Sequence, residues 1–229
     1  MPLHVSVFKE WEMLRLRGVS LAIRRISSLL FFGKSRENIR PQLAGAYKRQ
    51  EIKMRLFIAI NFSNEIKGKL ADAQDALRKH ALSGNFTRTE NLHLTLIFLG
   101  ETPQNRLETI KQAIDSIQEK AFELRANGSG RFSRNGGDIW WIGMEENHTL
   151  KKIHSVLADS LTASGFDIEE REFKPHLTLA RKVLLKNEKN IPKITGSFNI
   201  VVDKISLMKS EQIKGTLTYT EIYSKVLNG

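Results

Sequence analysis

The amino-acid sequence predicts a mixed α and β fold made of two similar lobes, and three observations lead to this expectation. From Met54 onward, segments with the two-residue period of strands alternate with segments that have the 3.6-residue period of helices. The tetrapeptide His-Leu-Thr-Leu occurs twice, beginning at His93 and at His176. Each copy follows an amphipathic helix in the same order of elements, which indicates an internal duplication although the halves share little other sequence.

The first predicted lobe opens with a β-rich apolar run over residues 55–61. A helix follows to about His80, capped by Ser63 or Asn64. Residues 83–85 (Ser-Gly-Asn) are expected to end this region, and the first motif is expected on a strand over residues 92–98. Thr102 is then expected to cap a second helix, with Pro103 at its first position. The inward stripes of the two helices are Ile66, Leu70, Ala73 and Leu77, and Leu107, Ile110, Ile114 and Ile117.

The second predicted lobe has the same sequence of elements. Extended segments are expected over residues 122–126 and 139–144, on either side of a Gly-Gly-Asp turn at 136–138. A third helix over about 149–164 ends at Gly165, and its inward stripe is Ile153, Val156, Leu157 and Leu161. The second motif is expected on a strand over 176–181. Alternating residues over 197–207 and 216–226, around a turn near 212–215, predict a last pair of strands.

The repeated tetrapeptide indicates acid–base chemistry on an anion. In a strand, each His and the Thr two residues later point to the same face, roughly 6–7 Å apart, while the leucines point into the core. Two such strands side by side would present two imidazoles and two hydroxyls to one pocket. Histidine titrates near neutral pH, so one imidazole can donate a proton while the other accepts one. Threonine hydroxyls can stabilise phosphate oxygens, and the set requires neither a metal nor a cofactor.

The composition excludes several other classes of function. The chain of 229 residues has no cysteine, which excludes disulfides, thiolate metal sites and cysteine nucleophiles. This fits a reducing compartment, so a cytoplasmic location is expected. No run of 18–20 apolar residues is present, so no membrane span is expected. The net charge is +11, but the first 53 residues hold 11 Lys and Arg against 4 Asp and Glu, which leaves 25 against 21 for the rest.

Residues 1–53 differ from the rest of the chain and allow three interpretations. Apolar residues between Phe8 and Phe32, interleaved with arginines, can form a basic amphipathic helix on a membrane surface or a partner. The segment can also be a disordered extension, or Met54 can be the biological start of the protein. We favour the last two, which divide the chain into a basic extension (1–53), either disordered or not part of the native protein, and a two-lobed domain (54–229).

The two motifs, with their neighbours, also resemble a known family. The segments are Asn-Leu-His-Leu-Thr-Leu-Ile-Phe-Leu-Gly-Glu over residues 91–101 and Lys-Pro-His-Leu-Thr-Leu-Ala-Arg over residues 174–181. They resemble the paired His-x-Thr-x motifs of the 2H phosphoesterase superfamily, and within it the bacterial and archaeal RNA 2′,3′-cyclic phosphodiesterases, once called 2′-5′ RNA ligases. The run Arg-Leu-Phe-Ile-Ala-Ile over residues 55–60 is similar to the first strand of that family. The resemblance extends from Met54 to near the C-terminus.

The resemblance implies an α+β fold of two pseudo-symmetric lobes, with antiparallel sheets that line a central cleft and helices outside. The implied reaction is the metal-independent opening of a nucleoside 2′,3′-cyclic phosphate, at the end of an RNA or on a nucleotide, to a 2′-phosphomonoester. By position, His93 is the proton donor to the departing 3′ oxygen and His176 the proton acceptor from water. Thr95 and Thr178 bind the phosphate. A monomer without a cofactor or metal is expected to suffice.

Two further sets of residues are candidates for substrate contact. Arg181, five residues after His176, can bind a phosphate bidentately, although strict strand alternation would place it on the face opposite His176. Aromatic residues near the motifs can stack on a base, and adjacent Trp140 and Trp141 must point to opposite faces of a strand. These aromatic candidates are Phe57, Phe98, Trp140, Trp141 and Phe173.

Other functions remain open at the level of sequence. The same four side chains would serve hydrolysis of a 2′-5′ phosphodiester, hydrolysis of a nucleotide-derived cyclic phosphate, or 2′-5′ RNA ligation. A protein of another class, a non-catalytic RNA-binding module, could keep the cleft without turnover. The presence of both His and Thr in both copies disfavours this last interpretation, because binding alone does not need two proton-transfer groups.

Overall fold

The computed structural model describes residues 52–187 and 197–228, and the chain divides into two units, residues 1–50 and residues 51–229. The expectations for residues 1–53 therefore fall, apart from the last two residues, outside the described part. Within the described ranges, no helix combines the length and apolar character that crossing a bilayer requires.

The second unit is built from nine strands and three helices in its described residues. The strands are β1 (Lys53–Asn61), β2 (Ala81–Phe86), β3 (His93–Pro103), β4 (Phe122–Phe132), β5 (Asp138–Met144), β6 (His176–Leu185), β7 (Phe198–Val202), β8 (Lys204–Ile213) and β9 (Thr216–Val226). The helices are α3 (Asn64–His80), α4 (Leu107–Asp115) and α5 (His148–Ala163). Two 3₁₀ turns, η1 (Thr89–Asn91) and η2 (Gln104–Arg106), precede β3 and α4.

All nine described strands belong to one antiparallel sheet. Eight follow the order β7-β4-β5-β6-β3-β1-β8-β9, and the ninth, β2, also pairs with β6. The sheet consists of two lobes. The first lobe contains β1, β3, β8 and β9, and the second contains β2, β4, β5, β6 and β7. The two motif strands, β3 and β6, are neighbours at the centre, and their backbones pair at Leu94 and Leu177. The expected α+β fold of two pseudo-symmetric lobes is confirmed.

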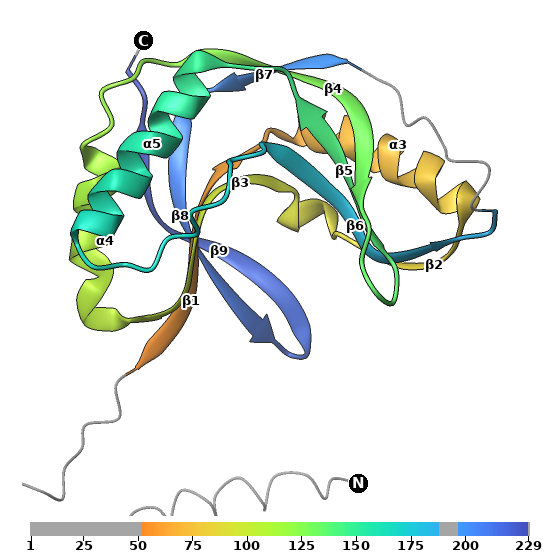
Figure 1. The fold of residues 1–229 in the computed structure, drawn as a ribbon, viewed down its shortest axis with the longest axis horizontal. Coiled ribbons are helices and arrows are strands. Elements are labelled where there is room, and N and C mark those ends of the chain that lie inside the picture. The colour runs from red at the N-terminus through yellow and green to blue at the C-terminus, as the bar shows by residue number, and fades with distance from the viewer. Residues whose placement is uncertain (1–51, 188–196, 229) are drawn as a thin grey trace, which may run out of the picture. The chain divides into compact units, whose positions relative to one another are not determined.

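The helices exchange between the lobes. Helix α3 follows β1 of the first lobe but packs against β6 and β2 of the second, whereas α5 follows β5 of the second lobe but packs against β3 of the first. Figure 1 shows α4 and α5 together on one side of the sheet and α3 well apart from them, over the other lobe. Because each lobe is covered by a helix from the other lobe's part of the sequence, one continuous core spans both.

The two faces of the sheet differ in what covers them. In β1, Leu56, Ile58 and Ile60 point into the main core beneath the helices. The intervening Phe57 and Ala59 point to the opposite face, where they form a small separate cluster with Met208 of β8. This second cluster explains why β1 is apolar without alternation, and it lies on the face that carries His93.

Most predicted elements are present, with three differences. Thr102 and Pro103 end β3 instead of starting a helix: the Thr102 hydroxyl donates to carbonyls of its own strand, at Leu99 and Gly100, and α4 begins only at Leu107. Residues 83–85, expected to be a break, lie within the edge strand β2. The last extended region divides at Asp203 into β7, which joins the second lobe, and β8, which joins the first.

Gln74 of α3 is a buried polar residue that ties the helix to the second motif strand. Its side chain is 2% exposed, and its Nε2 donates to the carbonyls of Thr87 and Leu179, both at 2.7 Å. The Leu179 carbonyl also accepts the backbone N–H of Thr87. The amide thus holds α3, the segment after β2 and the middle of β6 together.

We expect the substitution Gln74→Leu to lower the free energy of unfolding by about 1–3 kcal/mol, because the carbonyls of Thr87 and Leu179 then lose the amide that donates to both. Urea denaturation measures this as a lower midpoint at an unchanged slope. Gln112→Leu, at an exposed site of α4, is the matched control and should change stability by less than about 0.5 kcal/mol. Equal effects of the two substitutions would contradict the role given to Gln74.

Candidate active site

The pairing of Leu94 with Leu177 determines how the two motifs meet. Both leucines are buried in the core, so the residues on either side of each leucine project from the opposite face of the sheet. Counting one residue outward along antiparallel strands puts His93 level with Thr178, and Thr95 level with His176. The Leu pair thus lies on a pseudo-two-fold axis between the motifs, and the prediction that the two strands lie side by side is confirmed.

His93 is oriented by hydrogen bonds at both ring nitrogens. Its Nδ1 lies 2.7 Å from the carbonyl oxygen of Asn91, which can only accept, so Nδ1 carries a hydrogen. Its Nε2 lies 3.0 Å from the Thr95 hydroxyl. The rings of Phe57 and Tyr219 pack against the imidazole, with centroids at 4.8 and 5.2 Å. In the neutral form, Nε2 therefore holds the lone pair and is the atom available for proton transfer.

Asn91 connects His93 to the far strand of the first lobe, a role that the sequence analysis missed. Its side chain is 7% exposed. Its Nδ2 donates to the carbonyl of Leu217 at 2.9 Å, and its Oδ1 accepts the N–H of Tyr219 at 3.3 Å. One residue thus anchors η1 to β9 through its side chain and orients the imidazole through its carbonyl. The only sequence signal is its position two residues before the motif.

His176 repeats the arrangement of His93. Its Nδ1 lies 2.7 Å from the carbonyl oxygen of Lys174, again two residues earlier, so its Nε2 is also the free ring nitrogen. Aromatic rings flank this imidazole too, with centroids of Phe132 and Trp141 at 5.2 and 6.2 Å. The two histidines therefore share the hydrogen bond at Nδ1 and differ in their surroundings.

The structure shows which of the two adjacent tryptophans lies in the core and which lies at the site. Trp140 is 1% exposed in the core, whereas Trp141 lies opposite Thr178 and next to His176. The indole of Trp141 lies over Gly130 of β4, where an added Cβ would be 2.3 Å from its Cζ2 atom. Glycine at position 130 is therefore required for Trp141 to lie beside His176.

A β-bulge in each motif strand changes the side of the residues that follow. In β6, Trp140 pairs with Ala180 and Trp141 with Thr178, so Leu179 is an extra residue, and both Leu179 and Ala180 face the core. In β3, Ile58 pairs with Ile97 and Ala59 with Thr95, so Leu96 is the extra residue. The bulge shifts the alternation by one, which returns the fifth residue after each His to the face of that His.

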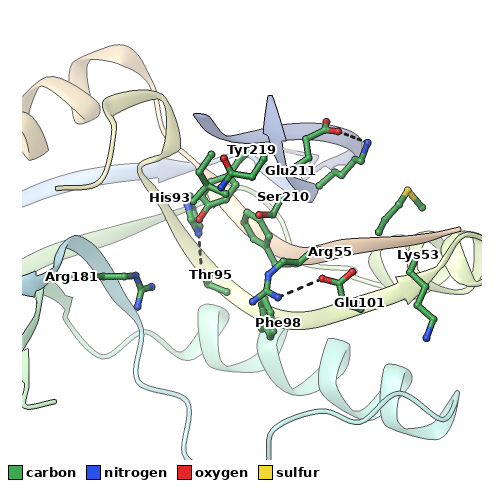
Figure 2. A pocket seen from close by; sticks show the side chains of 15 residues that line it. Lys53, Arg55, His93, Thr95, Phe98, Glu101, Arg181, Ser210, Glu211 and Tyr219 are labelled. Carbon is green, nitrogen blue, oxygen red and sulfur yellow. Dashed lines mark hydrogen bonds and ion pairs between the residues drawn. The ribbon is translucent and has the colours of Figure 1, made fainter. Parts of the chain in front are cut away.

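These fifth residues are Phe98 and Arg181, and both line one cavity of about 810 Å³. The expectation that alternation would place Arg181 opposite His176 is therefore wrong, because it assumed a regular strand. The cavity wall also contains His93 and Thr95, and Figure 2 shows Arg181 directed toward Thr95 from the opposite strand. His176 and Thr178, on the same strand as Arg181, are not among the described residues of this wall.

Burial and positive charge keep both imidazoles neutral. Burial, together with the charges of Arg181 and Lys67, lowers the pKa of His93 to about 4, although the hydrogen bond to Asn91 opposes this shift. Burial also lowers the pKa of His176 below its usual 6.5, with contributions from Arg181 and Arg171. Arg181 thus acts on both histidines, so the site combines two neutral imidazoles with a fixed cation. Such a site is suited to an anion.

Comparisons with known proteins identify the family of this chain. A model of the 2′-5′ RNA ligase superfamily matches residues 66–213. An RNA 2′,3′-cyclic phosphodiesterase of Thermotoga maritima is 32% identical over 180 residues, 76% of this chain and 93% of that protein. The Escherichia coli protein of the same name is 27% identical over 73% of this chain and 93% of its own length.

Solved structures show the same similarity. The crystal structure of Escherichia coli LigT in apo form covers 79% of this chain and all of its own, with a TM-score of 0.66 and 27% identity. LigT complexed with 3′-AMP has a TM-score of 0.68 at 26% identity and covers 78% of this chain and all of its own. The chain belongs to the 2′-5′ RNA ligase superfamily of 2H phosphoesterases.

The electrostatic role of Arg181 leads to a prediction for histidine titration. Because the cation opposes protonation of both imidazoles, we expect Arg181→Ala to raise the pKa values of His93 and His176. The pKa values are measured from the ring carbon shifts in NMR spectra, assigned with the variants His93→Gln and His176→Gln. Arg125→Ala, at an exposed residue of β4, is the control and should leave both pKa values unchanged. Unchanged pKa values in Arg181→Ala would place this cation away from the histidines in solution.

Proposed function

We propose that this chain is an RNA 2′,3′-cyclic phosphodiesterase, which opens a nucleoside 2′,3′-cyclic phosphate to a 2′-phosphomonoester by two-histidine acid–base catalysis without a metal. Membership of the superfamily supports a phosphoesterase activity, and the names of the similar proteins support this substrate class. The observation that carries the proposal is the meeting of the two His-Leu-Thr-Leu strands at Leu94 and Leu177, which gathers two imidazoles and two hydroxyls around one axis.

In the proposed reaction, the oxygen of a water molecule attacks the phosphorus atom, and the bond between phosphorus and the 3′ oxygen breaks. His176 takes a proton from the attacking water at Nε2, and His93 gives a proton from Nε2 to the departing 3′ oxygen. Thr95 and Thr178 donate hydrogen bonds to the phosphate oxygens, and Arg181 binds them as a cation. The assignment of acid and base follows the family resemblance, because both histidines belong to the same tetrapeptide and share the same hydrogen bond at Nδ1.

The negative charge of the substrate favours the protonated form of His93 that the reaction needs, and this proton comes from solvent. In the free protein, the pKa of His93 is about 4, so its imidazole is neutral near pH 7. A phosphodiester anion beside the ring favours the imidazolium form and raises this pKa on binding. The lowered pKa of His176 keeps that imidazole neutral at the same pH, which is the form that accepts a proton.

Single substitutions test the two-histidine mechanism. We expect His93→Ala and His176→Ala each to lower kcat on a nucleoside 2′,3′-cyclic phosphate by about 10²–10⁴-fold, the usual contribution of a positioned proton transfer. The assays contain EDTA, and the unmodified protein should keep its activity there. The exposed His148 of α5 offers the control His148→Ala. Full activity of either active-site variant, or loss of activity with EDTA, would refute the mechanism.

Product analysis tests which bond breaks. An RNA that ends in a 2′,3′-cyclic phosphate should yield a 2′-phosphate, detected by chromatography against 2′- and 3′-phosphate standards. A 3′-phosphate product would reverse the leaving oxygen. The same reaction with a second RNA that carries a 5′-hydroxyl tests the alternative of ligation, in which that hydroxyl replaces water and a 2′-5′ linkage forms. A linked product in place of the 2′-phosphate would favour the alternative.

A further inference from the structure

The cavity that contains His93 continues well beyond the groups that would hold the phosphate. From His93, Thr95 and Arg181 it extends along β1, the second half of β3 and the β8–β9 hairpin. The described residues of this outer part include Lys53, Arg55, Phe98, Glu101, Lys209 and Glu211. In Figure 2, Phe98, Arg55 and Glu101 lie between Thr95 and Lys53. We call the part formed by Lys53, Arg55 and Phe98 the outer subsite.

Phe98 is an exposed aromatic residue at a position where the fold presents it to the cavity. It pairs across the strands with Phe57, which is 4% exposed beside His93, whereas Phe98 is 52% exposed. The bulge at Leu96 places it on this face, as the matching bulge in β6 places Arg181 there. An aromatic ring half open to a polar cavity is a surface on which a base can stack.

Arg55 extends this surface. Its guanidinium carbon lies 4.9 Å from the centroid of the Phe98 ring, a cation–π contact. It also forms an ion pair of 3.6 Å with Glu101. Both side chains are more than half exposed, so this ion pair is weak and leaves the guanidinium available to a ligand. Arginine planes stack on bases as aromatic rings do, and the cation can in addition bind a phosphate.

The charge of the cavity wall favours a polyanion. Its described residues include four cations, at Lys53, Arg55, Arg181 and Lys209, and two carboxylates, at Glu101 and Glu211. Lys209 forms an ion pair with Glu211 at 2.7 Å. Lys53 forms no ion pair with another described residue. The wall therefore carries an excess of two positive charges, and part of this excess lies in the outer subsite, away from Arg181.

The chemistry of the proposed substrate limits what this subsite can hold. A 2′,3′-cyclic phosphate closes the 3′ end of a chain, so every further nucleotide lies on its 5′ side. Because Leu96 is an extra residue, Thr95 pairs with Ala59 and Phe98 with Phe57, so Phe98 lies two residues, or roughly 7 Å, beyond Thr95 along the sheet, and Arg55 lies two residues further. This interval separates the outer subsite from the groups that would hold the terminal phosphate. A base and a phosphodiester beyond the terminal nucleoside need an aromatic surface and a cation.

We propose that the outer subsite binds the nucleotide on the 5′ side of the terminal cyclic phosphate, with its base on Phe98 and its phosphodiester at Arg55 and Lys53. This inference rests on the proposed function and deepens it. It makes the protein selective for the 3′ ends of polynucleotides over free cyclic nucleotides.

The ratio of two kcat/KM values tests the subsite. One substrate is uridine 2′,3′-cyclic phosphate, and the other is a dinucleotide that ends in the same group. The unmodified protein should prefer the dinucleotide by roughly 5- to 150-fold, the range of one base–aromatic stack. Phe98→Ala should bring this ratio close to one, and Phe98→Trp should retain it. Leu82→Ala, at a 71% exposed residue of β2 in the other lobe, is the matched control and should retain it too.

Three outcomes would overturn the inference: no preference of the unmodified protein for the dinucleotide, an unchanged ratio in Phe98→Ala, or an equal loss on both substrates. The last would mean that Phe98 contacts the terminal nucleoside instead. If neither substrate is hydrolysed, the proposed function fails, and the subsite is then tested by fluorescence anisotropy with a labelled trinucleotide 3′-phosphate. Weaker binding by Phe98→Ala than by Leu82→Ala supports the subsite, and equal binding overturns it.

Discussion

The arrangement of this protein depends on one short contact, the backbone pairing of Leu94 with Leu177 between β3 and β6. This pair joins two lobes into one sheet and sets both motifs on the same face. A contact this short cannot by itself hold two lobes in register. The exchange of α3 and α5 between the lobes provides the remaining constraint, because each helix seals the core of the opposite lobe. The site at the axis is thus held by the whole core.

Two local features shape the site, a hydrogen bond to each His and a bulge after each Thr, and each feature occurs in both motif strands. A carbonyl two residues before each His accepts a hydrogen bond from Nδ1, so the lone pair of the neutral ring is on Nε2. A bulge after each Thr returns the fifth residue to the face of the histidines. The bulge in β6 is supported from outside the strand by Gln74, whose amide binds the carbonyl of the extra residue, Leu179.

The asymmetry of the site comes from what surrounds these repeated parts. The fifth residue is a phenylalanine in one lobe and an arginine in the other, so one side of the cavity offers a stacking surface and the other a cation. His93 packs against Phe57 and Tyr219 and has its pKa lowered to about 4. His176 lies beside Phe132 and Trp141. The two identical motifs therefore have different surroundings, while the roles of acid and base in the proposed reaction follow the family resemblance.

The sequence by itself determined the motif strands, the shared face of each His and its Thr, and the helix stripes, because strand and helix periods are local properties of the backbone. Only the tertiary structure decided the side of Arg181 and Phe98, since a bulge depends on the register of a partner strand. The same holds for β2, an edge strand without an apolar pattern, and for Asn91 and Gln74, whose partners are more than 100 residues away in sequence or in another element. Alternation sets faces within a strand, but long-range pairing decides where that alternation is interrupted.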